Sequence, residues 1–381
     1  MTDNSRLLLL GCGHAHLFVL EALARERFPP VRAVLVSPDQ EYFYSGMIPA
    51  VIAGRHRSER ARLRPPRLAR AAGAEFVRDR AVRVDPAERV VYLAEGPPLS
   101  YDLLSIDVGA GMAGAGLPGV REHALPLRPM KRALELVPEV TSAVAGAPPG
   151  SRTGVVVAGG GAGGVEVALC LDAALERRFG GRESYRVTIL EAGPEVLEGY
   201  PAGARTLARK LLRERGVEVR ITAKVAAVAE GVVQGEGSAR WPFDRLVWAT
   251  GPGAPELPAE SGLPMDTEGY LKVEPTLAAL RHTGVFAAGD CASVEGFPWM
   301  ARAGVYAVRQ GPVLARNLVA YLEQEPLQRY HPQRHWLSLL NTGDGRALLS
   351  YRGRSWHGRP GWWLKNWIDL KFVRRFQKLE E

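Results

Sequence analysis

The chain has 381 residues, 46% of them hydrophobic, and carries a formal net charge of +8 at pH 7. This length allows two domains with sizeable cores, and no apolar run approaches the ~18 residues of a membrane-spanning helix. The cysteines are few and scattered and no cleavage-site pattern follows the N-terminus, so we expect a cytoplasmic protein without a disulfide framework.

Nearly all of the positive charge comes from arginine, and most of the basic residues are interleaved with acids. This pattern favours solvated helix faces over a nucleic-acid surface. We therefore predict no nucleic-acid partner, and we predict no metal site.

The first informative stretch is Leu7–His16, LLLLGCGHAH. Four leucines predict a strand buried on both faces, and a helix is expected over residues 14–25. Between them, Gly11 allows a tight turn, Gly13 lets the backbone approach a pyrophosphate, and the helix N-terminus offers N–H groups to negative charge. His16 stands where a third glycine is usual, so this motif alone is equally compatible with an ordinary tight turn.

The same design recurs in Val155–Gly164, VVVAGGGAGG, this time with all three glycines. These are Gly159, Gly161 and Gly164. Each copy is followed by a buried strand that ends in a glycine turn, SIDVGA at residues 105–110 and LVWATG at residues 246–251. Matching signals in the same order predict two nucleotide-binding units in one α/β chain.

The two units differ at the end of their second strand. The strand expected over residues 31–36 is followed by Ser37 and Asp39, either of which could contact a ribose, while Asp39 is equally well explained as a turn residue. The strand over residues 185–190 ends at Glu191, whose carboxylate would accept hydrogen bonds from ribose hydroxyls and repel a 2′-phosphate. The second unit is therefore predicted to prefer NADH over NADPH.

Three further features bear on a ligand site. Glu166 lies early in a helix expected over residues 164–178, where an acid is favoured by the helix dipole alone or lies near a nicotinamide. The strand in residues 284–290, GVFAAGD, ends at Asp290, whose carboxylate could accept a hydrogen bond from a ribityl hydroxyl. The aromatic segment 41–54 could lie against a flat ring system or form an ordinary hydrophobic loop.

Proline and glycine predict where the chain is interrupted. Residues 129–144 are expected to form a helix with a kink at Pro138, and residues 300–321 a helix broken near Pro312. The glycine-rich run 109–119 is expected to be the first crossing between two domains.

The tail over residues 352–378 combines aromatic and basic side chains, including four tryptophans. Such mixtures suit an anionic membrane surface, but the apolar residues spread around the whole helical projection. The tail therefore predicts either peripheral contact with the inner face of the cell membrane or a helix packed on the first domain or on the partner of a homodimer.

Five ordered motifs resemble the FAD-dependent pyridine nucleotide oxidoreductases with two dinucleotide-binding domains: GCGHAH, YDLLSIDVGA, VVVAGGGAGGVEVA, LVWATG and GVFAAGDCA. Within that group the chain is most similar to type II NADH:quinone oxidoreductases and to the NADH dehydrogenase-like module joined to selenophosphate synthetases. The resemblance implies an α/β fold with two Rossmann-like domains. An NAD(P)H-binding domain (residues 120–250) would split an FAD-binding domain (residues 1–119 and 251–325), ahead of a C-terminal segment (residues 326–381).

The resemblance also implies the cofactors and the residues that hold them. FAD is expected on the first unit, at Gly11, Gly13, His14, Ala15, Ser37, Gly109, Gly289 and Asp290. NADH is expected on the second unit, at Gly159, Gly161, Gly164, Glu191 and Gly251. Glu166 is expected to order the nicotinamide and is the one predicted catalytic residue.

The implied activity is hydride transfer from NADH to the flavin, followed by electron transfer to a quinone or similar small acceptor in a ping-pong cycle. The alternative from another class is an FAD-binding redox sensor or partner-docking protein with slow NADH turnover. The chain departs from the family's disulfide reductases because it has no closely spaced cysteine pair. It departs from the quinone reductases because Val305 and Arg309 stand where those enzymes carry glutamines, with Gln310 adjacent.

Overall fold

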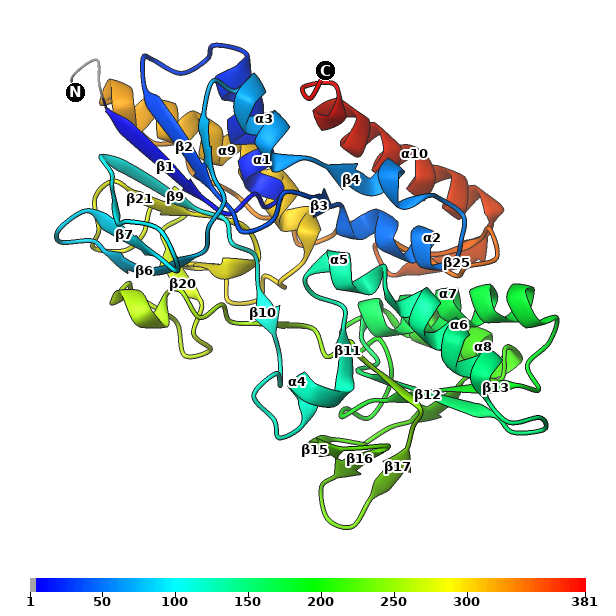
Figure 1. The fold of residues 1–381 in the computed structure, drawn as a ribbon. Helices are drawn as coiled ribbons and strands as arrows, with labels where there is room; N and C mark the ends of the chain where they lie inside the picture. Colours follow the sequence, from blue (N-terminus) through cyan, green and yellow to red (C-terminus); the bar gives the residue numbers. More distant parts are fainter. Residues whose placement is uncertain (1–4) are drawn as a thin grey trace.

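The computed structural model describes residues 5–381, which form two five-stranded parallel sheets with flanking helices (Figure 1). The first sheet has the order β21-β9-β1-β2-β5 and contains β1 (Arg6–Leu10), β2 (Arg32–Val36), β5 (Glu75–Val77), β9 (Leu103–Ile106) and β21 (Val285–Ala287). The second has the order β11-β18-β12-β13-β14 and contains β11 (Ala124–Pro126), β12 (Thr153–Ala158), β13 (Tyr185–Leu190), β14 (Glu218–Arg220) and β18 (Arg245–Trp248).

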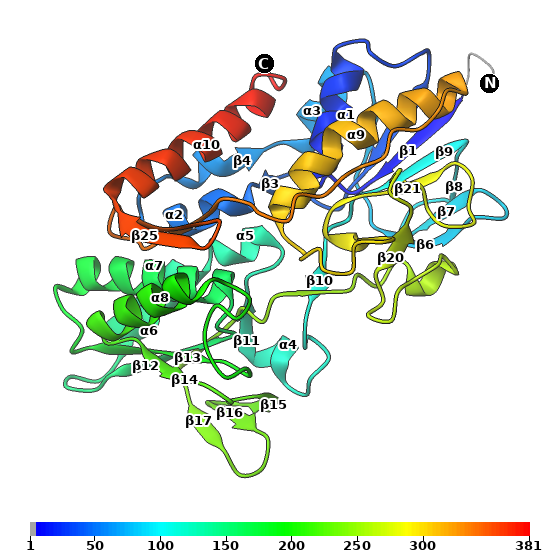
Figure 2. The ribbon, with the colours of Figure 1, turned by 180° about the vertical axis from the view of Figure 1, so that it is seen from behind.

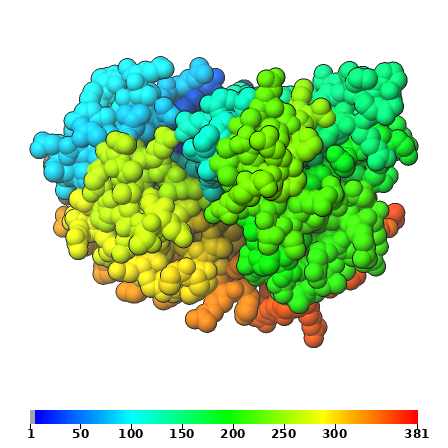
Figure 3. Space-filling view, turned by 90° about the horizontal axis from the view of Figure 1, so that it is seen from below, coloured from blue at the N-terminus to red at the C-terminus, as the bar shows by residue number. Residues whose placement is uncertain are grey.

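The predicted fold class is confirmed, because two Rossmann-like parallel sheets are present and the second interrupts the first. Strand β21 follows the whole second sheet in the chain and returns to pair with β9. The two connections between the sheets lie side by side, since β10 (Gly111–Met112) pairs antiparallel with β19 (Pro252–Gly253). In the view from below, the green segments form one lobe beside a lobe of blue, cyan and yellow segments (Figure 3).

Ten α-helices lie within residues 5–381. They are α1 (His14–Ala24), α2 (Ile48–Ile52), α3 (Pro65–Ala71), α4 (Val120–His123), α5 (Met130–Ala133), α6 (Leu136–Gly146), α7 (Ala162–Phe179), α8 (Ala202–Glu214), α9 (Gly304–Glu323) and α10 (Arg359–Gln377). The smaller strands are β3 (Tyr42–Phe43), β4 (Arg62–Leu63), β6 (Ala81–Asp85), β7 (Val90–Leu93), β8 (Leu99–Ser100), β15 (Val225–Ala229), β16 (Val232–Gly235), β17 (Arg240–Pro242), β20 (Leu271–Val273), β22 (Ala292–Val294), β23 (Ser338–Asn341), β24 (Ala347–Tyr351) and β25 (Arg354–Gly358).

The interruptions expected at two prolines are wrong. Helix α9 continues through Pro312, because it packs tightly against α1: a Cβ on Gly311 would lie 2.3 Å from the Phe18 ring. The chain between residues 130 and 146 breaks before Pro138, between α5 and α6. Pro138 occupies the first turn of α6, where a missing N–H costs no intrahelical hydrogen bond.

The C-terminal segment lies across both units (Figure 2). Strands β23, β24 and β25 form an antiparallel sheet that contacts α7 and α8, and α10 then runs along the first unit. On its inner face Val373 and Phe376 are fully buried, and Arg375 Nη2 lies 2.5 Å from the Glu21 carboxylate of α1. Within residues 5–381, no helix is long and apolar enough to cross a membrane.

A buried cation also holds α10 in place. Lys365 is 7% exposed and donates hydrogen bonds to Asp369 Oδ2 (3.0 Å) and to the Gly46 carbonyl (2.8 Å). Asp369 is itself buried. Because a buried charge is costly unless it is paired and hydrogen-bonded, these contacts join the tail to the loop before α2.

We expect Lys365→Met to lower the free energy of unfolding by about 3–5 kcal/mol, since it leaves a buried carboxylate without its cation. Urea denaturation measures this change. The matched control is Lys371→Met on the exposed side of the same helix, which should change stability by no more than about 0.5 kcal/mol. Equal effects of the two substitutions would contradict a buried, paired Lys365.

Candidate functional site

The first glycine turn connects β1 to α1 and requires glycine at two positions. Gly11 has φ +83°, and a Cβ there would lie 2.4 Å from the Asp107 carbonyl oxygen. A Cβ on Gly13 would lie 2.3 Å from the Asp107 carboxylate. Since real Cβ atoms do not approach this closely, both glycines are needed to bring the turn against the end of β9.

The carboxylate of Asp107 caps α1. Its Oδ2 atom accepts hydrogen bonds from the backbone N–H groups of Ala15 (2.8 Å) and His16 (2.9 Å), and the residue is 2% exposed. Burial raises the Asp107 pKa to about 7, the two N–H groups oppose that rise, and the charge of Asp290 adds to it. The sequence analysis missed this residue, although SIDVGA carries an acid where LVWATG has Ala249.

Two histidines surround the turn in neutral form. His16 fills the place of the third glycine: its Nδ1 atom lies 2.6 Å from the Gly11 carbonyl and its Nε2 atom 2.8 Å from Ser105 Oγ. The carbonyl can only accept, so Nδ1 donates and Nε2 accepts from the hydroxyl. His14 Nδ1 lies 2.9 Å from the Tyr42 hydroxyl. Burial lowers the pKa of each histidine to about 4.

Residues that follow β21 and β11, and one residue of α9, gather near this turn. Gly289 and Asp290 follow β21, and Asp290 pairs with Arg128 at 3.3 Å. The Gln310 side chain accepts from the Gly289 N–H (2.7 Å), while its buried Nε2 has no partner among residues 5–381. Sequence reasoning missed Arg128 and noted Gln310 only as the neighbour of a position where a glutamine is expected, because only the fold brings both residues to this strand end.

Two of the expected residues lie at the edges of the site. Ser37 is buried at the end of β2 and makes a long hydrogen bond to the Asp39 carbonyl (3.5 Å). Gly109 follows β9 with φ +73°, and a Cβ there would have no neighbour within 4 Å. The predicted first-unit residues therefore converge on the carboxyl ends of β1, β2, β9 and β21.

The second glycine turn, between β12 and α7, repeats the first. A Cβ on Gly159 (φ +108°) would lie 2.4 Å from the Ala249 carbonyl, and one on Gly164 would lie 1.9 Å from the Gly159 carbonyl. In contrast, Gly161 and Gly251 have nothing within 4 Å of an added Cβ. The start of α7 therefore faces open space, where the start of α1 faces a carboxylate.

Glu191 lies beside the second turn, at the end of β13. Its two carboxylate oxygens accept hydrogen bonds from the backbone N–H groups of Gly160 and Gly193, each at 2.6 Å. Backbone N–H groups therefore hold the carboxylate in place, and no cation among residues 5–381 pairs with it. This position is where a bound dinucleotide would present its adenosine ribose.

Glu166 faces the C-terminal segment. It is the fifth residue of α7, so the helix-dipole explanation for an acid in the first turn does not hold. Its Oε1 atom accepts from the Asn341 N–H (2.6 Å) and lies 4.0 Å from Lys365 Nζ. Burial raises the Glu166 pKa to about 7, although Lys365 and the Asn341 N–H oppose the rise. Because Lys365 is already paired with Asp369, a neutral Glu166 leaves this buried group without net charge.

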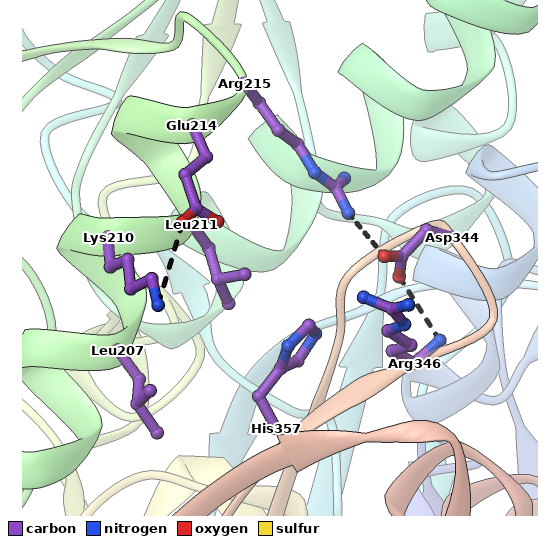
Figure 4. A pocket seen from close by; sticks show the side chains of 8 residues that line it. All are labelled: Leu207, Lys210, Leu211, Glu214, Arg215, Asp344, Arg346 and His357. Atoms are coloured by element: carbon purple, nitrogen blue, oxygen red, sulfur yellow. Dashed lines mark hydrogen bonds and ion pairs between the residues drawn. The ribbon is translucent and has the colours of Figure 1, made fainter.

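A cavity of about 360 Å³ lies elsewhere, between α8 and the C-terminal sheet (Figure 4). Its charged side chains pair with one another: Lys210 with Glu214 (3.7 Å) and Arg215 with Asp344 (3.0 Å). None of the predicted site residues lines it. The Arg215–Asp344 pair joins the tail to the residue that follows α8, whereas the Lys210–Glu214 pair lies within α8.

Comparison with known proteins places the chain in a family. An NADH dehydrogenase-like protein of Mycobacterium tuberculosis is 29% identical over 226 residues, which cover 59% of this chain and 56% of that protein, so the match spans about half of the relative's length. A demethylphylloquinone reductase of Synechocystis is 27% identical and covers 96% of this chain and 99% of its own. The structure of NDH2 from Plasmodium falciparum in complex with NADH superposes with a TM-score of 0.80 at 15% identity, covering 98% of this chain and 97% of that one. The model of the pyridine nucleotide-disulphide oxidoreductases matches residues 5–317, and the chain therefore belongs to that family.

Proposed function

We propose that the protein is an FAD-dependent NADH dehydrogenase that passes electrons from NADH through the flavin to a quinone or a similar small acceptor. The observation that carries this proposal is the pair of matching glycine turns in one chain. Gly11 and Gly159 approach the neighbouring strand equally closely, so each unit has the geometry of a dinucleotide turn. A quinone reductase that aligns along nearly the whole chain supports the choice of acceptor.

The residues around the first glycine turn suit the binding of FAD. Open space at Gly109 leaves room for a ligand, and the buried Nε2 donor of Gln310 has no partner within the described residues 5–381. Asp290 supplies a carboxylate for a ribityl hydroxyl, and Arg128 beside it supplies positive charge for a phosphate. The residue that fits less well is Asp107, which already accepts from the N-terminus of α1.

The second unit fits NADH. The start of α7 is open at Gly161 and Gly251, so its N–H groups are accessible to a pyrophosphate. Glu191 is positioned to accept hydrogen bonds from both ribose hydroxyls, and its charge disfavours a 2′-phosphate. A neutral Glu166 has an O–H group to donate, which suits the carboxamide of a nicotinamide.

Bound FAD would supply the redox chemistry itself, as hydride acceptor and electron donor. The residues of this chain bind and orient. The glycine turns allow close approach of the pyrophosphates, Glu191 selects the nucleotide, and Glu166 orders its reactive ring. Helix α10 and the aromatic segment 41–54 are in contact through Tyr44 and Phe372, and both rings pack against His14.

Steady-state kinetics with NADH and a soluble quinone test this function. A ping-pong cycle predicts parallel double-reciprocal lines, because NAD⁺ leaves before the quinone reacts. Intersecting lines would contradict it. If every quinone reoxidises the reduced flavin slowly, and the oligomeric state changes when the flavin is reduced, the redox-sensor alternative is favoured.

We expect Glu191→Ala to raise the KM for NADH by about 10–100-fold, because it removes charge-assisted hydrogen bonds worth about 1.5–3 kcal/mol. The KM for NADPH should change less, so discrimination between the nucleotides falls. The control is Glu195→Gln in the same loop, which loses a charge that is paired with Arg205. An unchanged NADH-to-NADPH preference in Glu191→Ala would refute the assignment.

We also propose that the protein contacts the membrane peripherally through an aromatic face formed by Trp356, Trp363, Leu364 and Trp367. Trp363 and Trp367 are 64% and 59% exposed, although large aromatic side chains are usually buried. Lys371 lies over the Trp367 ring, 4.9 Å from its centroid. Exposed tryptophan beside basic residues suits the interface of an anionic bilayer.

Substitution of Trp363 and Trp367 by serine should weaken binding to vesicles rich in phosphatidylglycerol by at least about tenfold, because each buried aromatic side chain contributes about 1.5–3 kcal/mol. Co-sedimentation measures the loss. Trp299→Ser is the control, since Trp299 is 41% exposed on another surface. If the double variant binds vesicles normally but no longer self-associates, the aromatic face is a dimer contact and the membrane proposal is wrong.

A further inference from the structure

The two glycine turns provide an internal comparison, because they differ in one strand-end residue. Asp107 in the first unit occupies the position of Ala249 in the second, and the carbonyls of both residues lie 2.4 Å from a Cβ built on the facing glycine. The second turn is open at Gly161. The first is closed at the equivalent Gly13 by the Asp107 side chain.

The Asp107 carboxylate occupies the surface that a pyrophosphate would use. Added Cβ atoms on Gly13 and Gly289 would lie 2.3 and 2.5 Å from its Oδ1 atom. Its Oδ2 atom takes the N–H groups of Ala15 and His16, which are the donors that a helix N-terminus offers to phosphate. An ionised carboxylate and a pyrophosphate are both acceptors, so they repel each other and compete for the same donors.

The surroundings of Asp107 supply no compensating cation. No lysine or arginine within residues 5–381 forms an ion pair with it, since Arg128 pairs instead with Asp290, an acid that follows β21. The histidines of α1 are neutral because burial lowers their pKa values. The remaining titratable groups that face Asp107 are Tyr42, Cys12 and Cys291, and burial raises their pKa values so that they too stay neutral.

We propose that Asp107 is an internal competitor for the FAD pyrophosphate at the N-terminus of α1, so that FAD binding takes up one proton onto the Asp107 carboxyl group. This inference rests on the proposed function, because it needs FAD on the first unit. A protonated carboxyl group no longer repels the phosphates and can donate its O–H to a phosphate oxygen. The side chain is 2% exposed and enclosed by glycine backbone, so protonation is a simpler route than moving it into solvent.

The Asp107 carboxyl group can take up a proton near neutral pH. Burial raises the Asp107 pKa to about 7 in the protein without ligand, and the negative charge of Asp290 acts in the same direction. A nearby pyrophosphate would raise it further. FAD affinity should therefore fall as pH rises above about 7, with a limiting slope of about tenfold per pH unit for one linked proton.

The experiment measures FAD binding to protein from which flavin has been removed, by fluorescence between about pH 6 and about pH 9. Calorimetry in two buffers of different ionisation enthalpy counts the proton. For the wild type, FAD affinity should fall as pH rises, and binding should take up one proton. Two variants should lose both the pH dependence and the proton uptake. Asp107→Ala introduces the residue that the second unit has at the matching position, and Asp107→Asn preserves the size of the side chain. At about pH 8, Asp107→Ala should bind FAD about tenfold more tightly than the wild type.

The matched control is Asp102→Asn. Asp102 caps the opposite end of β1 through the Arg6 N–H (2.7 Å), so its loss should leave the pH dependence unchanged. If the FAD affinity of the wild type does not depend on pH, or if Asp107→Asn keeps the pH dependence, the proposal that Asp107 competes with the pyrophosphate is wrong. The proposal that the protein is an NADH dehydrogenase is not affected by either result. Failure of the wild type and of Asp107→Ala to bind FAD at any pH would overturn both proposals.

Discussion

The arrangement depends on one steric constraint, which is the contact of each glycine turn with the backbone at the end of the neighbouring strand. At Gly11 and Gly159 a Cβ would lie 2.4 Å from a carbonyl oxygen, so no other residue lets the turn close. With both turns closed, α1 and α7 begin at the carboxyl ends of their sheets. Polar groups from neighbouring strands meet there, as in other open α/β sheets.

Buried charge is handled differently in the two units. Beside the second, Lys365 of the tail pairs with Asp369 of the same helix and lies 4.0 Å from Glu166. In the first, the hydrogen bonds to the Asp107 carboxylate within the described part of the chain come from backbone N–H groups. The tail therefore contributes a charge next to Glu166 of the second unit, whereas Asp107 in the first unit has no ion-pair partner among residues 5–381.

Local patterns were sufficient to predict the framework. The runs LLLL and VVVA predicted the central strands, and the glycine spacing predicted both turns, since these features depend on neighbours in the chain. Glu191 was identified as a strand-end acid for the same reason. The course of α9 through Pro312 could not be predicted, because it depends on Phe18 in a helix almost 300 positions earlier.

The parts of the site that sequence reasoning missed are long-range contacts. Asp107 meets Ala15 and His16 across 92 and 91 positions, and Glu166 meets Asn341 across 175. Arg128 and Gln310 likewise join the site only through the fold. The Asp107 contact had one usable signal, the mismatch with Ala249 in the second copy of the motif.

The most direct test of the account is an anaerobic visible spectrum of the FAD-loaded protein before and after NADH is added. Two dinucleotide sites serving one flavin predict rapid bleaching of the flavin absorbance by NADH and much slower bleaching by an equal amount of NADPH. A bound flavin that NADH does not bleach would contradict hydride transfer between the two units.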